Sequence, residues 1–411
     1  RVGASAGDSF SGTDATNNTL IGYAAGTAIT TGDQSVALGM NALMATTTAS
    51  QNTALGYYSL GVNSTGAENT AVGHLALHSN TTASYNTAVG KSALVNNTTG
   101  GQNSAVGYRS LGANTTGDQN TSLGADSMYT NTTGEYNVGL GFMALYTNNA
   151  DNNTAVGFQS LLVNTTGTSN VAVGAYALDA NTTAQGNTAV GYNSLTANTT
   201  GSENTAVGVL SLDANTTGNY NVGLGDEALT TNTTGSYNTA IGRRALYLAT
   251  TANSNVAIGY TALNSTTTGA SNTGCGTNTL QQNTTGYQNT AVGTNALDAC
   301  TTGNENTAIG QQALTNTTTS SYNTAVGRAA LNDNTTGGQN TAVGQNSLAD
   351  NTTASNNVAL GFQALRLNTT GSENTAVGSY ALDANTTGLY NTAVGHDSLG
   401  SNTTGDRNCA F

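Results

Sequence analysis

Apolar side chains recur along the chain at fixed places within a unit of 17 residues. The consensus unit is N-T-A-V-G-x-x-A-L-x-x-N-T-T-G-x-x, with Val, Leu or Ile at position 4 and Leu at position 9 in nearly every copy. Counted from Asn18, residues 18–407 hold 23 copies, one of which, residues 137–152, is one residue shorter, and residues 408–411 begin another. A fixed period of this length is typical of solenoids and related arrays, in which each unit packs against its neighbours.

The unit is too short, and too rich in Gly and Thr, for a helical repeat. Thr-Ala-Val at positions 2–4 predicts one strand, and Ala-Leu at positions 8–9 predicts a second. Gly at position 5 and the Asn-Thr-Thr-Gly segment mark the corners, since Gly and Asn tolerate left-handed backbone angles. The pattern therefore predicts an all-β fold, a parallel β-solenoid or β-roll of about 23 coils.

Residues 1–17 fit the repeat poorly, so we expect an irregular N-terminal cap or junction there. Residues 18–411 are expected to form one continuous solenoid whose last repeat is truncated.

Side chains alternate across a strand, so positions 2 and 4 share one face and position 3 takes the other. Position 4 and the Leu at position 9 carry the large apolar groups, and we expect them to fill the coil interior. Ala at position 3 would then face outward with Asn at position 1 and Gly at position 5. Such an interior is thin, which predicts burial against other subunits and hence self-association.

Charged residues make up 7% of the chain, against roughly 25% in an ordinary soluble domain. The net charge is −13, with a pI of about 4.2. Phosphate backbones and anionic membranes attract clustered Lys and Arg, so this balance argues against nucleic acid as a partner. The chain has no run of about 20 apolar residues, so we expect no membrane insertion in this segment.

Candidate chemistry is sparse. The three histidines, His74, His78 and His396, and the three cysteines, Cys275, Cys300 and Cys409, form no cluster of the kind that metal binding or nucleophilic catalysis needs. Cys275 takes the place of the position-4 Val and is interpreted as a small core hydrophobe. Acidic residues recur at positions 16–17 and are interpreted as a solvated edge. Tyr recurs at position 17, where it would pack over the corner or stack on sugars.

The Asn-Thr-Thr corner allows two interpretations. It is a turn with a Thr ladder, and it is also N-x-[ST], the acceptor for N-glycosylation, which would place glycans along one exposed edge. The candidate acceptors occupy position 12 of their coils: Asn63, Asn80, Asn97, Asn114, Asn131, Asn164, Asn181, Asn198, Asn215, Asn232, Asn283, Asn334, Asn351, Asn368, Asn385 and Asn402.

Ser35-Val36-Ala37-Leu38-Gly39 resembles the S-V-A-I-G core of the YadA-like head repeats of trimeric autotransporter adhesins, and residues 255–259 and 357–361 are similar. Comparable repeats occur in phage tail-fibre shafts. The resemblance extends over residues 18–411 through one short motif, although Thr at position 2 and the longer period depart from the common head repeat. It implies a left-handed β-roll, a homotrimer, and an often adhesive place on a cell or virion surface.

We therefore expect a non-catalytic, extracellular structural or adhesive fibre, or an adhesin-head shaft. It would self-associate as a homotrimer or head-to-tail filament and bind host or matrix surface ligands. A viral or phage tail-fibre segment is the alternative. Ice binding through Thr ladders is a third hypothesis, which is disfavoured because Thr at position 2 is expected to point inward. No position departs from the repeat to form a pocket, so no enzyme and no cofactor other than N-linked glycans is expected.

Overall fold

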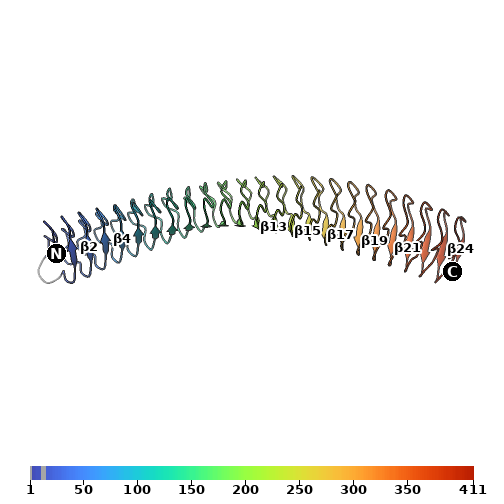
Figure 1. Cartoon of the computed structure of the whole chain (residues 1–411), viewed down its shortest axis with the longest axis horizontal. Helices are drawn as coiled ribbons and strands as arrows, with labels where there is room; N and C mark the ends of the chain where they lie inside the picture. The colour runs from blue at the N-terminus through green and yellow to red at the C-terminus, as the bar shows by residue number, and fades with distance from the viewer. Residues whose placement is uncertain (1, 11–14) are drawn as a thin grey trace. The chain divides into compact units, whose positions relative to one another are not determined.

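The computed structural model describes residues 2–10 and 15–411, which are all-β and contain no helix. They form a parallel β-solenoid of about 23 turns with strands 17 residues apart, which confirms the predicted fold class. The predicted left-handed winding stays a prediction. The chain divides into two compact units, Arg1–Glu203 and Asn204–Phe411, and each is a stack of coils of the same design (Figure 1). Nowhere do the described residues form a helix that is long and apolar enough to cross a membrane.

Each strand lies at positions 2–4 of its coil. The first unit contains β1 (Thr19–Ile21), β2 (Val36–Leu38), β3 (Thr53–Leu55), β4 (Thr70–Val72), β5 (Thr87–Val89), β6 (Ser104–Val106), β7 (Thr121–Leu123), β8 (Val138–Leu140), β9 (Thr154–Val156), β10 (Val171–Val173) and β11 (Thr188–Val190). The second unit contains β12 (Thr205–Val207), β13 (Val222–Leu224), β14 (Thr239–Ile241), β15 (Val256–Ile258), β16 (Thr273–Cys275), β17 (Thr290–Val292), β18 (Thr307–Ile309), β19 (Thr324–Val326), β20 (Thr341–Val343), β21 (Val358–Leu360), β22 (Thr375–Val377), β23 (Thr392–Val394) and β24 (Cys409–Ala410).

Within each unit, successive strands pair in parallel and in register, so equivalent positions stack on one another. Ala71 of β4 lies opposite Ala88 of β5, and Ala342 of β20 lies opposite Ala359 of β21. Figure 1 shows the strand arrows of neighbouring coils lying side by side. Each column of the structure therefore contains one repeat position, spaced by about 4.8 Å, as parallel strands require.

The predicted second strand at positions 8–9 is wrong. Ser92 at position 7 and Leu94 at position 9 have φ of 59° and 49°, and the equivalent residues of the other coils share this left-handed conformation. Left-handed backbone costs roughly 1–2 kcal/mol per non-glycine residue. The turn nevertheless stabilises the stack of coils, because Leu94 N–H donates to Ser110 O of the next coil at 3.1 Å and the Leu94 side chain is fully buried.

The glycine at position 5 is required by two features. Gly107 has φ of 137°, which L side chains rarely adopt, and a Cβ built there would lie 2.4 Å from Gly124 O in the next coil. The corner predicted at this position is confirmed, and close approach between coils explains why glycine occupies it.

The predicted faces of the strand are reversed. Ala at position 3 is the interior residue, with Ala71 and Ala88 fully buried, whereas positions 2 and 4 are partly exposed in the same strands. The interior placement of Leu at position 9 is correct. Because that leucine reaches toward the strand from the opposite side of a narrow coil, only a small side chain fits at position 3. At Gly223, which occupies position 3 of β13, a Cβ would already lie 3.3 Å from Leu212 Cδ1.

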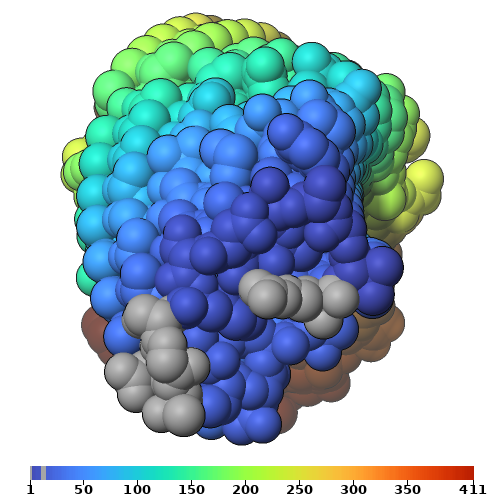
Figure 2. All heavy atoms as spheres, turned by 90° about the vertical axis from the view of Figure 1, so that its left-hand side faces the viewer, coloured from blue at the N-terminus to red at the C-terminus, as the bar shows by residue number. Residues whose placement is uncertain are grey.

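The N-terminal segment adds part of a coil. Val2 forms a parallel bridge with Ile21, and its N–H donates to Leu20 O at 2.8 Å. Residues 11–14 of the expected cap lie outside the described residues. In Figure 2, which faces this end of the first unit, the dark blue N-terminal residues pack closely against one another.

The interior of the first coil, which begins at Asn18, is filled by different side chains from those of the other coils. Leu20 replaces Ala at position 3, Gly26 replaces Leu at position 9, and Ile29 replaces Asn at position 12. A Cβ at Gly26 would lie 2.9 Å from Cδ1 of both Leu20 and Ile29, so the two larger side chains fill the space of the missing leucine. This exchange keeps the interior filled without an Asn.

Candidate functional site

The asparagines at position 12 form amide ladders inside the coils. Asn97 Nδ2 donates to Asn80 Oδ1 at 3.1 Å and to Gly100 O at 2.8 Å, and Asn97 Oδ1 accepts from Asn114 Nδ2 at 2.7 Å. All three asparagines are fully buried. Each side chain therefore closes its own turn and links its coil to both neighbours, as buried amides must to satisfy their donors and acceptors.

The exposed edge predicted for the glycosylation acceptors is therefore wrong. Of the candidate acceptors, only Asn402 is partly exposed, and the others are fully buried: Asn63, Asn80, Asn97, Asn114, Asn131, Asn164, Asn181, Asn198, Asn215, Asn232, Asn283, Asn334, Asn351, Asn368 and Asn385. Nδ2 is the atom that a glycan would take, and in the ladder this atom is a buried donor. A sugar there would break the ladder and would have no space in the coil.

The ladder has two natural gaps in the second unit. Where Ala249 and Cys300 occupy position 12, the preceding asparagines, Asn232 and Asn283, have buried Oδ1 atoms without a hydrogen-bond partner. Burial raises the pKa of the Cys300 thiol to about 11, and Cys300 Sγ lies 3.7 Å from Gly303 O. These gaps show that the ladder is directional, because each coil supplies the donor for the coil before it.

A second amide ladder occupies position 1, which was predicted to face outward. Asn103 is fully buried, its N–H donates to Asn86 Oδ1 at 2.9 Å, and its Nδ2 donates to Gly117 O at 2.9 Å. The near-invariance of Asn in this column therefore reflects interior hydrogen bonding. Sequence reasoning missed both ladders, although the recurrence of one amide at one position was the available signal.

The outward side of the strands forms a continuous uncharged surface within each unit, and we call the side chains at positions 2 and 4 the sheet face. Position 2 is Thr, Val, Ser or Cys, and position 4 is Val, Leu, Ile or Cys in β1–β23. Leu123 is 50% exposed, Leu38 is 45% exposed and Ile309 is 41% exposed. Branched apolar side chains thus form an exposed column beside a column that is mostly threonine.

The cysteines are all free, and two of them lie on the sheet face. Cys275 at position 4 is partly exposed, which corrects its interpretation as a core residue, and Cys409 at position 2 is exposed. Cys300 is buried.

The structure brings His74 and His78 together with tyrosines. The His74 and Tyr57 rings stack at 5.2 Å, and the His78 and Tyr58 rings meet edge to face at 5.5 Å. Within the described residues no group of three or more His, Cys, Asp or Glu side chains is arranged to hold a metal ion.

Several arginine side chains form ion pairs or cation–π contacts with side chains of neighbouring coils. Arg109 pairs with Asp126 of the next coil at 2.7 Å and lies between the rings of Tyr108 and Tyr129, 4.8 and 4.7 Å from their centroids. The hydrogen bond to Asp126 raises the pKa of this guanidinium. The exposed tyrosines at position 17 also meet one another where they are adjacent, as in the Tyr220–Tyr237 stack at 5.0 Å.

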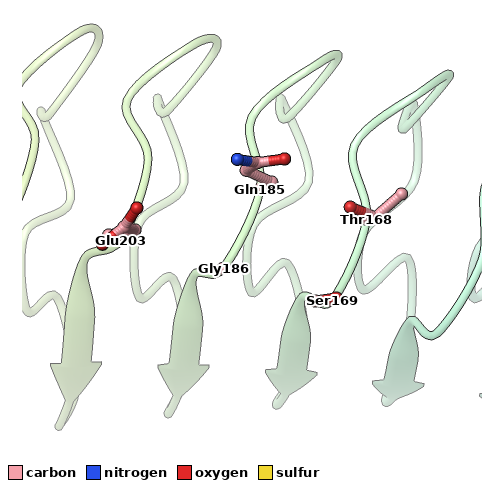
Figure 3. Close-up of a pocket in the computed structure, with 5 residues that line it drawn as sticks. All are labelled: Thr168, Ser169, Gln185, Gly186 and Glu203. Carbon is pink, nitrogen blue, oxygen red and sulfur yellow. The ribbon is translucent and has the colours of Figure 1, made fainter.

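Two shallow hollows occur in the first unit. One, of about 290 Å³, is lined by Thr168, Ser169, Gln185, Gly186 and Glu203. Figure 3 shows that these residues occupy the same corner of three successive coils, where Gly186 lacks the side chain that its neighbours carry. The other, of about 350 Å³, is lined by Tyr176, Asp179, Tyr192, Asn193 and Thr196.

No family model matches the chain, and no curated protein matches it either. The resemblance to YadA-like head repeats therefore stays an expectation that rests on the repeat motif, and the geometry of the coils carries the functional argument.

Proposed function

We propose that the chain is a non-catalytic, extracellular fibre shaft whose coils associate side by side, in parallel, with further copies of the same chain through the sheet face. The observation that carries this proposal is the uncharged column of partly exposed Val, Leu and Ile, with one Cys, at position 4 in each unit. Monomeric soluble proteins rarely expose contiguous apolar surface on this scale.

A second copy fits this face better than a globular ligand does. Nearly every coil offers one branched side chain, and where a third to a half of it is exposed, covering it contributes about 0.5–1 kcal/mol. A globular partner would cover a few coils, whereas another chain with the same 17-residue repeat can match coil after coil. The contributions then add along the stack, as nearest-neighbour terms do in repeat proteins.

The likeness of the repeat to adhesin heads and tail-fibre shafts supports a place on a cell or virion surface. Exposed tyrosines at position 17, such as Tyr85 and Tyr237, would serve the adhesive part of the role toward host or matrix surface ligands.

Native cysteines provide the first test. In a parallel, in-register assembly Cys275 faces Cys275 of another copy and Cys409 faces Cys409, while buried Cys300 faces neither. Mild oxidation should give like-to-like disulfides by mass spectrometry, and light scattering should give a multiple of 41.0 kDa. A stable 41.0 kDa species at micromolar concentration would refute the assembly, and mixed links between Cys275 and Cys409 would refute the register.

Charged variants provide the matched control. Val173→Glu with Val190→Glu puts two carboxylates on the sheet face and should weaken the assembly, because they would be buried unpaired. Thr183→Glu with Thr200→Glu adds the same charges to the same coils at an exposed corner and should leave the assembly unchanged. Equal effects of the two pairs would contradict the proposal.

Ice binding is the second candidate, because one argument against it fails. Thr at position 2 points outward, as in Thr70 and Thr87, and forms a ladder with a spacing of about 4.8 Å. The neighbouring column is apolar, which favours association with another chain. Thermal hysteresis of the purified chain in proportion to its concentration would favour ice binding.

A further inference from the structure

In several coils a polar side chain at position 10 contacts a backbone carbonyl of the preceding coil, that of position 7, which lies 20 residues earlier. Among the described residues this contact recurs as a hydrogen bond in both units. Three threonines donate through Oγ1: Thr196 to Tyr176 O at 3.3 Å, Thr230 to Leu210 O at 3.0 Å, and Thr315 to Asn295 O at 3.0 Å. Asn264 Nδ2 donates to Arg244 O at 3.2 Å, and His78 Nδ1 lies 3.2 Å from Tyr58 O and donates when that nitrogen carries the proton. The fold therefore provides a recurrent place for a side-chain donor at position 10.

Four aspartates stand at position 10, namely Asp179, Asp213, Asp298 and Asp383, and two of them, Asp179 and Asp298, have a buried carboxylate oxygen without a partner. The carbonyls at the equivalent spacing of 20 residues are that of Gln159 for Asp179 and that of Asn278 for Asp298. Among the described residues no backbone N–H pairs with either carbonyl. The Oδ1 atoms of Asp179 and Asp298 are buried and have no hydrogen-bond partner. An ionised carboxylate only accepts hydrogen bonds, so in that form neither the carboxylate oxygen nor the backbone carbonyl oxygen supplies a hydrogen for a bond between them.

The surroundings of Asp298 contain no cation. The coils on either side, residues 272–288 and 306–322, contain no charged residue, and their own position-10 side chains, Gln281 and Thr315, are neutral. Cys300 and Glu305 are the other titratable groups of its own coil. Burial raises the pKa of the Asp298 carboxyl above its ordinary value of 3.8.

Asp179 has similar surroundings. Tyr176 and Tyr192 line the same hollow, and Glu203 is the one charged residue of the next coil. Residues 110–242 contain no Lys, Arg or His. Burial raises the pKa of Asp179, and backbone hydrogen bonds from Ala180 and from Asp179 itself partly oppose this.

We propose that Asp179 and Asp298 are acid-operated clamps between coils, in which the protonated carboxyl donates its O–H to the carbonyl of Gln159 or Asn278. Acid thereby closes the same link that Thr, Asn and His close elsewhere. Because the pKa is higher in the folded chain, the added stability is full below the unfolded value near 3.8 and is lost as the pH rises through the folded value. The coils around these residues therefore tighten on acidification and loosen toward neutrality.

Selective ¹³C labelling of the full chain provides a direct test at Asp298. The carboxyl carbon of Asp298 and the carbonyl carbon of Asn278 should titrate with one shared midpoint above 3.8. In Asp298→Ala the Asn278 carbonyl should show no such titration. Separate midpoints, or a midpoint at the ordinary value, would overturn the proposal.

Hydrogen exchange of the Leu280 amide distinguishes two effects of protonating Asp298: a new hydrogen bond from its O–H, and the removal of a buried negative charge. In the unmodified chain its protection should rise about fivefold below the Asp298 midpoint, the ratio that one ordinary hydrogen bond gives. Asp298→Thr supplies a permanent donor and should show the higher protection at neutral pH with no further rise in acid, whereas Asp298→Ala should not reach it. If Ala and Thr protect equally, burial alone explains the shift and the clamp is refuted. Asp333→Asn, at the exposed position 11 two coils away, is the control and should change nothing.

Discussion

The position-12 ladder leads to a prediction about how a gap in it can be repaired. At Cys300 the ladder is broken, so Asn283 Oδ1 is buried without a donor. The next coil has Thr317 at this position, and its hydroxyl donates to Asn334 O at 3.2 Å while accepting from Asn334 Nδ2 at 3.2 Å. Cys300→Asn alone would supply a donor to Asn283, but its own carbonyl oxygen would then face Thr317, whose hydrogen is already used.

The single substitution therefore moves the unpaired acceptor by one coil and should change the free energy of unfolding by less than about 1 kcal/mol. Cys300→Asn combined with Thr317→Asn completes the chain of amides from Asn283 to Asn334 and removes the unpaired acceptor. A buried acceptor left unpaired costs about 1–3 kcal/mol, so the double variant should be more stable by that amount. Thr317→Asn alone should be near neutral, because its new amide has no acceptor at Cys300.

Native-state hydrogen exchange suits this measurement, because the stability of a repeat protein is local. Protection of the Leu280 and Leu297 amides, which donate to the coils that follow them, should rise in the double variant alone. The four chains form a double-mutant cycle whose coupling energy should equal most of the gain. If Cys300→Asn alone gave the full gain, or if the two changes were additive, the directional ladder would be refuted.

Three further predictions follow from the interior. Leu229→Asp should destabilise its coil by more than the roughly 2–5 kcal/mol of a leucine truncation, because it also buries an unpaired carboxylate, and limited proteolysis near residue 229 should detect the opening. Gly107→Ala should open the first unit locally, because its Cβ would lie 2.4 Å from Gly124 O, so the Gly124 amide should lose hydrogen-exchange protection. Gly338→Ala, whose Cβ would lie 3.2 Å from Ser321 O, should affect its coil less. Chain secreted by a glycosylating host should carry no sugar at Asn97 in peptide mapping by mass spectrometry, since this amide is a buried ladder donor, and full occupancy at Asn97 in folded chain would contradict this.

The sequence by itself determined the architecture. A nearly constant period with Leu at position 9 and Gly at position 5 indicates similar coils in register, because a slip of one residue within the strands would move their side chains to the other face. The interior place of Leu94 and Leu229 and the corner at Gly107 followed from this pattern alone.

The tertiary structure decided which face of the strand is interior. Alternation defines two faces but does not say which one the coil encloses, and the larger side chain at position 4 was the natural choice. The coil is too narrow for it, because Leu at position 9 already fills the space opposite the strand, so alanine is enclosed and Val72 points out. The sheet face, and with it the proposed assembly, depends on this packing.

The roles of the asparagines were also decided in three dimensions. In one coil, Asn-Thr-Thr is compatible with an exposed turn, and nothing local distinguishes that turn from a buried amide. Only stacking places Asn97 Nδ2 within reach of Asn80 Oδ1, 17 residues away, and makes the amide a link between coils. The same holds for Asp298, whose neighbour across the coils, the Asn278 carbonyl, is defined by the stack, because contacts between coils depend on the pitch and width of the solenoid and not on the adjacent sequence.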